Sequence, residues 1–289
     1  MKNRFSLLST LFLSLSLLFF VTCNPDDDSD QMTETSVIKG GGLSVNNDSL
    51  RIGSLAHIAI KAVKGGKALN TITVQANGVN LVPGTFNLNG VASTANPALL
   101  FGGDRDSLLF TYDFARVDTP QTISYVFTIK DEGDRSVSDT VNIIYYGTPA
   151  SEVGKNLIVY NYSGTKFGGL DLFNVNVVSG NAPEATIRDY GVKDPVSDKT
   201  WVMRFVPLNN SEIMNPPANF SYSGLIYKEN IQRAFELGSR EPGIISSKVL
   251  AKGDYFLVKN GNTYFAVYIN NASVTANDNN DYFDVSIKR

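Results

Sequence analysis

The sequence predicts a mostly β protein with two β-rich domains and one short helix. The chain holds 13 Tyr and 17 Phe and is also rich in Val and Thr, and these aromatic and β-branched residues favour strands. Short apolar runs recur between turns that contain Gly, Asn or Pro, a spacing typical of sandwiches and barrels. Only residues 227–238 place their apolar side chains at helical spacing.

Residues 36–148 are interpreted as the first domain. Asn77-Gly78 and Pro83-Gly84 are among the pairs that separate its apolar runs, and such pairs provide the positive or preset φ angles that a chain reversal needs. We therefore expect one strand in each run between turns. The expected strands are residues 56–63, 71–76, 80–82, 107–114, 121–130 and 137–146.

The last two of these strands show the clearest alternation. Tyr125, Phe127 and Ile129 occupy every second position, so one face of the strand is expected to be buried. A polar turn that contains Gly133 then leads into a second alternating strand. Residues 125–131 and this turn resemble the closing hairpin of bacterial immunoglobulin-like and polycystic-kidney-disease-like domains. The resemblance implies an immunoglobulin-like β-sandwich that acts as a spacer or adhesion module.

A Pro/Gly break at residues 147–150 ends the first domain, and the second is placed at residues 150–289. Roughly 250 residues remain once the leader and tether described below are excluded, which is enough for two ordinary cores. Residues 227–238 place Ile231 and Phe235 on one helical face, so a short helix is expected there. The expected strands are residues 156–162, 168–172, 200–208, 243–250, 254–271 and 281–288.

Residues 255–268 predict a β-hairpin more strongly than any other segment. Two alternating strands flank Asn260-Gly261, and an Asn-Gly pair at this place is typical of a type I′ turn with a two-residue loop. Such a loop fixes the register and pairs Phe256 with Phe265. One face of the hairpin is therefore expected to lie in the core.

The opposite face of this hairpin carries Tyr255, Tyr264 and Tyr268. A tyrosine ring can stack on a sugar or a peptide while its hydroxyl forms a hydrogen bond, so the three residues are candidate ligand-binding residues. A second packed face is the alternative. Trp201, the only tryptophan, shares an expected strand face with Met203 and is likewise either core or a ligand platform.

The start of the chain has the pattern of a lipoprotein leader. Two basic residues precede an uncharged apolar run at residues 5–21, as in a secretory signal, although an uncleaved membrane anchor is the alternative. Cys23, the only cysteine, follows the run and has no partner for an internal disulfide. Residues 20–23 resemble the lipobox of bacterial lipoproteins. The resemblance implies that residues 1–22 are a lipoprotein signal peptide and that lipidated Cys23 holds the protein on a membrane.

Residues 23–35 are interpreted as an acidic tether. Its aspartates repel one another and bury no apolar surface, so a solvated spacer is expected. A cysteine followed by an acidic run resembles the surface-export signal of Bacteroidetes lipoproteins, and the layout of the whole chain resembles Bacteroidetes surface lipoproteins, which include glycan-binding lipoproteins of starch-utilisation-type systems. The resemblance implies a lipid-anchored protein of the outer membrane at the cell surface, with a TonB-dependent transporter as a candidate partner.

The charge of the chain argues against nucleic-acid binding. Without residues 1–22, 23 basic residues face 28 acidic ones, a net charge of −5. Five of the acidic residues lie in the tether, so the folded part has no basic field for a nucleic acid. A single histidine, His57, and a single cysteine form neither a metal-ligand set nor a nucleophile and base pair. No metal and no cofactor is therefore expected.

The carboxylates leave two alternatives open. The acidic turns at residues 131–134 and 278–281 are expected to be solvated, with Ca²⁺ binding as the alternative. A glycosidase-like hydrolase would need a pair of carboxylates. The candidates for such a pair are Glu184, Asp189, Asp194 and Asp198. Because nothing selects a pair, we expect no enzyme but a non-catalytic binding or adhesion module for a glycan or an extended peptide. A carbohydrate-active hydrolase and a purely structural envelope protein are the alternatives.

Overall fold

The computed structural model describes residues 33–243, 245–275 and 278–289, and it divides the chain into two compact units. The first unit runs through Asp48 and continues with Ala56–Ala115 and Ile123–Ile143, and the second comprises Ser49–Leu55, Arg116–Thr122 and Ile144–Arg289. The predicted domain boundary at residues 147–150 stays a prediction. The predicted leader and Cys23 lie outside the described residues.

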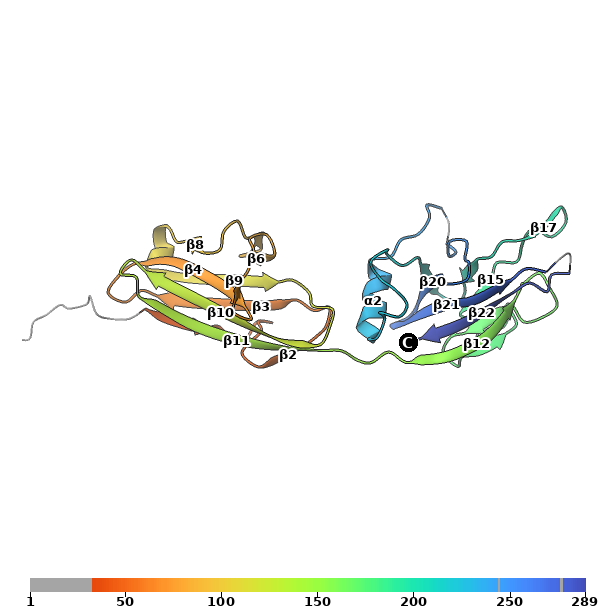
Figure 1. Ribbon diagram of the computed structural model, residues 1–289, viewed down its shortest axis with the longest axis horizontal. Helices are drawn as coiled ribbons and strands as arrows, with labels where there is room; N and C mark the ends of the chain where they lie inside the picture. The colour runs from red at the N-terminus through yellow and green to blue at the C-terminus, as the bar shows by residue number, and fades with distance from the viewer. Residues whose placement is uncertain (1–32, 244, 276–277) are drawn as a thin grey trace, which may run out of the picture. The chain divides into compact units, whose positions relative to one another are not determined.

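Two sheets form the first unit (Figure 1). One sheet has the order β1 (Glu34–Val37), β3 (Ala56–Val63), β9 (Ser107–Phe114), β6 (Phe86–Leu88) and β7 (Val91–Ala92). The other has the order β2 (Asp48–Arg51), β11 (Ser136–Tyr146), β10 (Gln121–Asp131), β4 (Leu69–Ala76) and β5 (Val79–Asn80), and β8 (Ala98–Leu99) also pairs with β4. A 3₁₀ helix, η2 (Gly102–Arg105), precedes β9.

The core of the first unit lies between these sheets. Ile60 and Tyr112 from one sheet and Phe127 and Ile143 from the other are buried. The Tyr112 and Phe127 rings lie 5.0 Å apart, centroid to centroid, so aromatic side chains from facing sheets interdigitate as in a sandwich. The predicted immunoglobulin-like β-sandwich and the mostly β class are confirmed. The predicted end of the tether is wrong, because β1 begins at Glu34 and pairs with β3.

The second unit contains two larger sheets and a small hairpin. The larger sheet has the order β12 (Glu152–Tyr160), β22 (Tyr282–Lys288), β21 (Thr263–Ser273), β20 (Tyr255–Asn260) and β19 (Ser211–Met214). The four-stranded sheet has the order β14 (Asn176–Val178), β13 (Gly169–Asp171), β15 (Ile187–Asp189) and β18 (Phe205–Pro207), and β16 (Val192–Asp194) pairs with β17 (Asp198–Trp201).

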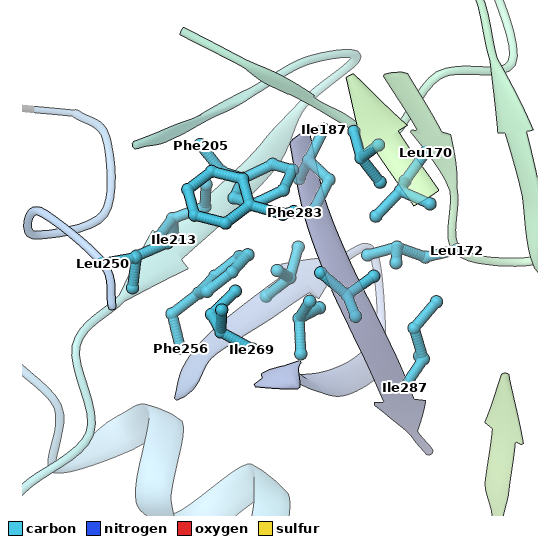
Figure 2. Packing of buried hydrophobic residues seen from close by; sticks show 14 of the residues in the cluster. Leu170, Leu172, Ile187, Phe205, Ile213, Leu250, Phe256, Ile269, Phe283 and Ile287 are labelled. Carbon is cyan, nitrogen blue, oxygen red and sulfur yellow. The ribbon is translucent and has the colours of Figure 1, made fainter. Parts of the chain in front are cut away.

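The main core of the second unit lies between the four-stranded and five-stranded sheets (Figure 2). Ile187 and Phe205 come from the four-stranded sheet, whereas Phe256 and Phe283 come from the five-stranded sheet. The Phe205 ring lies 5.1 Å from both Phe256 and Phe283. We call the side of the five-stranded sheet that points away from this core the outer face.

Helix α2 (Lys228–Glu236) covers part of the outer face. Ile231, Ala234 and Phe235 pack with Leu257 of β20 and Ala266 of β21 in a second apolar cluster, and Figure 1 shows the helix beside these two strands. Burial of its apolar stripe stabilises a helix too short to persist alone. The predicted helix at residues 227–238 is confirmed.

Two strand predictions in the second unit are wrong. Residues 200–208 do not form one strand, because β17 ends at Trp201 and β18 begins at Phe205, and Met203 between them has a φ of +40°. Residues 243 and 245–250 contain no strand in the described part of the chain. Their apolar run is an extended loop, in which the Ser247 and Leu250 amides donate hydrogen bonds to the carbonyls of Phe205 and Met203 at 2.9 Å.

The hairpin of β20 and β21 forms, but with a different turn from the one predicted. Asn260 pairs with Thr263 and Val258 with Phe265, so the two loop residues are Gly261 and Asn262. Gly261 has a φ of +58°, and glycine at the first central position is typical of a type II′ turn. Asn260 stays in the strand because its amide donates to the Asn209 carbonyl and the Ser211 hydroxyl. The predicted pair Phe256 with Phe265 is wrong by two positions, a shift that keeps every side chain on its predicted face.

Candidate functional site

The three hairpin tyrosines do not form an open platform. Tyr255 is only 8% exposed, Tyr264 packs edge-on against Phe235 of α2 at 5.5 Å, and Tyr268 stacks on Tyr222 at 4.8 Å. The helix and the segment before it cover this half of the outer face. Tyr255 is thus packed, whereas Tyr264 and Tyr268 are half-buried. The arrangement is close to the packed-face alternative, and a ligand-binding role for the three tyrosines stays a prediction.

Trp201 also lies in packed surroundings. Its side chain is 7% exposed, its ring centroid lies 4.5 Å from that of Phe283, and its indole nitrogen donates to Asp189 Oδ2 at 2.9 Å. One edge lines a pocket of about 460 Å³ together with Thr275 and Asp281. The tryptophan is thus a core residue with one edge at a pocket wall.

Asp189, one of the four carboxylates considered for hydrolysis, is fully buried. It accepts hydrogen bonds from the amides of Tyr162 and Gly191 at 2.9 and 2.8 Å, besides the bond from Trp201. Burial raises the pKa of Asp189 to about 7, although these donors favour its charged form, and the nearby Asp281 raises it further. The Asp189 carboxylate links the segments of Tyr162, Gly191 and Trp201 by hydrogen bonds. Because it is fully buried, a substrate cannot reach it.

The other three carboxylates lie at the surface. Asp194 accepts hydrogen bonds from the Val196 and Ser197 amides of its own turn, and Asp198 forms an ion pair with Lys193 at 3.0 Å. Glu184 lies in an exposed loop. These contacts close the β16–β17 turn, and the structure does not bring Asp194 or Asp198 into a pocket with Asp189.

An aromatic surface lies on the other half of the outer face, over β12 and β22. Tyr160 pairs across the strands with Tyr282, and their ring centroids lie 5.7 Å apart. The neighbouring residues Val159 and Phe283 are buried in the main core, so both tyrosines point outward. Phe167, 59% exposed, lines the same pocket as Tyr160. We call Tyr160, Lys166, Phe167 and Tyr282 the aromatic ledge.

Local hydrogen bonds bring the loop after β12 back onto this ledge. The Tyr160 amide donates to the Phe167 carbonyl at 3.0 Å, and the Gly164 amide donates to the Asn161 carbonyl at 2.9 Å. A Cβ at Gly168 would lie 2.8 Å from the Tyr160 carbonyl oxygen, so only glycine permits this close return. The Lys166 ammonium consequently lies 4.3 Å from the centre of the Tyr160 ring.

The ledge borders a shallow pocket of about 390 Å³. Ile158, Val177 and Phe167 are among its lining residues, and most of the exposed lining is apolar. Large aromatic side chains held open at a surface are enriched where proteins bind ligands. Tyr160, Phe167 and Tyr282 are not among the ligand-binding residues predicted from the sequence. The alternation of Tyr282 with Phe283 and Val285 is a local signal for an outward-facing side chain, but no local pattern indicates that β12 and β22 are neighbours.

Neither a metal centre nor a membrane span appears in the described part of the chain. Residues 33–243, 245–275 and 278–289 contain no group of three or more His, Cys, Asp or Glu side chains able to hold a metal ion. No helix in the same ranges is both long and apolar enough to cross a bilayer. In the first acidic turn, Asp131 accepts hydrogen bonds from the Gly133 and Arg135 amides. Calcium binding stays untested.

No protein-family model and no curated protein matches the chain. A conjugative transposon lipoprotein from Bacteroides eggerthii is similar at 17% identity over 38% of this chain and 95% of that one, with a TM-score of 0.28. The SrpA adhesin from Streptococcus sanguinis is 10% identical over 47% and 70%, with a TM-score of 0.27, and tandem Ig repeats of Dlar are 9% identical over 87% and 94%, also at 0.27. Likenesses this distant assign the chain to no family and to no function.

Proposed function

We propose that this protein is a non-catalytic binding module, held at the outer surface of the cell by lipidated Cys23, and that its aromatic ledge binds a glycan. The observation that carries the proposal is the outward-facing pair Tyr160 and Tyr282, with the exposed Phe167 beside it. Sugar rings stack on such faces, and tyrosine hydroxyls add hydrogen bonds at the edge. The immunoglobulin-like unit then serves as a spacer, and a TonB-dependent transporter is the partner that would take up the captured glycan.

An extended peptide is the second candidate ligand, because β12 is an edge strand of the five-stranded sheet. The Tyr160 amide already donates to the Phe167 carbonyl, so a peptide would add a strand along the part of β12 before Tyr160 and reach the ledge with side chains at its end. Strand addition depends on backbone hydrogen bonds, whereas glycan stacking depends on the aromatic rings. Removal of one ring should therefore weaken glycan binding more than peptide binding.

Tyr160→Ala is expected to weaken binding of the preferred glycan by about 1–3 kcal/mol, roughly 5- to 150-fold. The ligand would first be identified on a glycan array, and the affinities of both proteins would then be measured by calorimetry. Tyr190→Ala is a matched control, because Tyr190 is 45% exposed and lies outside the ledge. Equal losses in the two variants, or no bound glycan for the unaltered protein, would contradict the proposal.

Cys23→Ala is expected to release the protein from the membrane fraction. The diacylated cysteine implied by the lipobox resemblance places several acyl chains on one residue, and together they anchor durably where one chain is marginal. Fractionation and protease treatment of whole cells would measure both attachment and exposure. Retention of the variant with an uncleaved leader would instead support a membrane anchor formed by residues 5–21.

A further inference from the structure

A β-bulge in β21 changes which side chains reach the outer face next to the aromatic ledge. Ile269 pairs with Val285, but Asn271 pairs with Asp284, so one extra residue stands between them. Ile269 and Ala272 both pack on the main core. Bulges redirect side chains, and this one leaves Asn270 on the outer face, where its amide reaches β22.

Asn270 holds a small polar cluster on β22. Its amide nitrogen donates to Asp284 Oδ1 at 2.9 Å and to the Ser286 hydroxyl at 3.1 Å. Both atoms are thereby fixed in position. Within the described ranges, Asp284 Oδ2 accepts no hydrogen bond and Asp284 forms no ion pair. The Asp284 side chain is half-buried. The cluster therefore presents one oriented, unused acceptor to solvent.

The polar cluster and the aromatic ledge are continuous. Asp284 follows Tyr282 by two residues on the same face of β22, a step of about 7 Å along a strand. Ile158 pairs with Asp284 just as Tyr160 pairs with Tyr282. The outer face thus offers two aromatic rings tilted by 59° and, two residues further along the strands, the apolar side chain of Ile158 beside the carboxylate of Asp284.

We propose that the ledge and the cluster are two subsites for a neutral, hydroxyl-rich sugar chain. One sugar ring stacks on Tyr160 and touches Tyr282, whose ring is tilted by 59° from that of Tyr160. A hydroxyl of the next sugar donates to Asp284 Oδ2. This inference rests on the proposed function and adds the class of glycan and the direction in which it lies. A fixed carboxylate accepts hydrogen bonds from hydroxyls but repels the carboxylates and sulfates of acidic sugars.

Lys166 is the group that would favour acidic sugars instead. It has no ion pair in the part of the chain that the structure describes, but it is exposed and rests over the Tyr160 ring. A flexible exposed ammonium can move aside when a ring stacks there, whereas Asp284 is held by Asn270. The fixed carboxylate therefore determines the charge preference, and the lysine does not.

The inference is tested by calorimetry with the full folded protein and neutral oligosaccharides of one to six units identified on the array. The unaltered protein should bind chains of two or more units at least about tenfold more tightly than the single sugar. Asp284→Asn should remove that gain, because loss of a hydrogen bond to a charged acceptor costs roughly ten- to hundredfold in affinity. Glu236→Gln, at an exposed carboxylate of α2, is the matched control and should bind like the unaltered protein.

Three results would separate the possible failures. If Tyr160→Ala loses binding but Asp284→Asn binds long and short chains as before, the second subsite is wrong and the glycan-binding function stands. If acidic sugars bind more tightly than neutral ones and Lys166→Met removes this preference, the assignment of a neutral ligand is wrong. If the unaltered protein binds no sugar of either kind, the proposed function itself fails.

Discussion

Phe256→Ala is expected to lower the free energy of unfolding of the second unit by about 3–5 kcal/mol, the usual cost of truncating a buried phenylalanine. The Phe256 side chain is fully buried and stacks on Phe205 from the facing sheet. Phe205 also contacts Phe283, so the truncation leaves a cavity between two sheets whose strands are fixed by backbone hydrogen bonds. Such a site cannot collapse to fill the space.

Urea unfolding followed by tryptophan fluorescence would measure this change, because Trp201 is the only tryptophan and belongs to the same core. Phe167→Ala provides the control. That ring is 59% exposed, so its loss should change the free energy of unfolding by no more than about 0.5 kcal/mol. A Phe256→Ala loss below 1 kcal/mol would mean that the two sheets do not enclose this ring as described.

At pH 8, above the raised pKa of Asp189, Asp189→Asn is expected to destabilise the second unit by about 2–4 kcal/mol, although it changes the side chain by only one atom. Asp189 Oδ1 accepts both backbone amides, so the asparagine oxygen must take that place. The new NH₂ group then faces the indole N–H of Trp201. Both groups are donors, so the hydrogen bond that Asp189 Oδ2 accepted from the indole is lost. A buried indole N–H without a partner keeps its full desolvation cost.

The same carboxylate should make stability depend on pH. Burial raises the pKa of Asp189 in the folded protein to about 7, against an ordinary value of 3.8. Below pH 4 the group is protonated in both states. Between about pH 4 and 7 the folded state alone retains the proton, so the free energy of unfolding falls as pH rises through this range, by roughly 4 kcal/mol at most.

Urea unfolding at several pH values in both proteins would test these two statements together. The unaltered protein should lose stability from pH 4 to pH 7, and Asp189→Asn should lose much less over the same range, since its amide does not titrate. A flat profile in the unaltered protein would show that the three donors outweigh burial and keep the carboxylate charged.

The sequence predicts this fold well wherever the information is local. Alternation assigns Phe256 to the core and Tyr255 to the opposite face whatever the register, and the apolar stripe of residues 227–238 predicts the helix. The sequence does not predict the turn at Gly261, because hydrogen bonds to Asn209 and Ser211, which lie in a distant segment, hold Asn260 in its strand. The side-chain pattern alone cannot contain that constraint.

The candidate site was missed for a related reason. An amphipathic helix needs an apolar surface to cover. For α2 that surface includes Tyr255, Tyr264 and Tyr268, which the alternation of the hairpin predicted on its open face. Tyr160 and Tyr282 are not covered by the helix. They come from β12 and β22, and no local sequence pattern predicts that these two strands pair. Long-range pairing therefore decides which aromatic residues are free to meet a ligand and which are used for packing.

Tyr160 and Tyr282 come from the first and last strands of the five-stranded sheet in chain order, and β22 lies between β12 and β21. The aromatic ledge thus forms only when β22 is inserted beside β12, the strand of this sheet that is synthesised first. Such long-range closure is slow. If a sugar chain binds as proposed, it contacts both β12 and β22, so its binding requires completed folding and should slow the separation of these two strands.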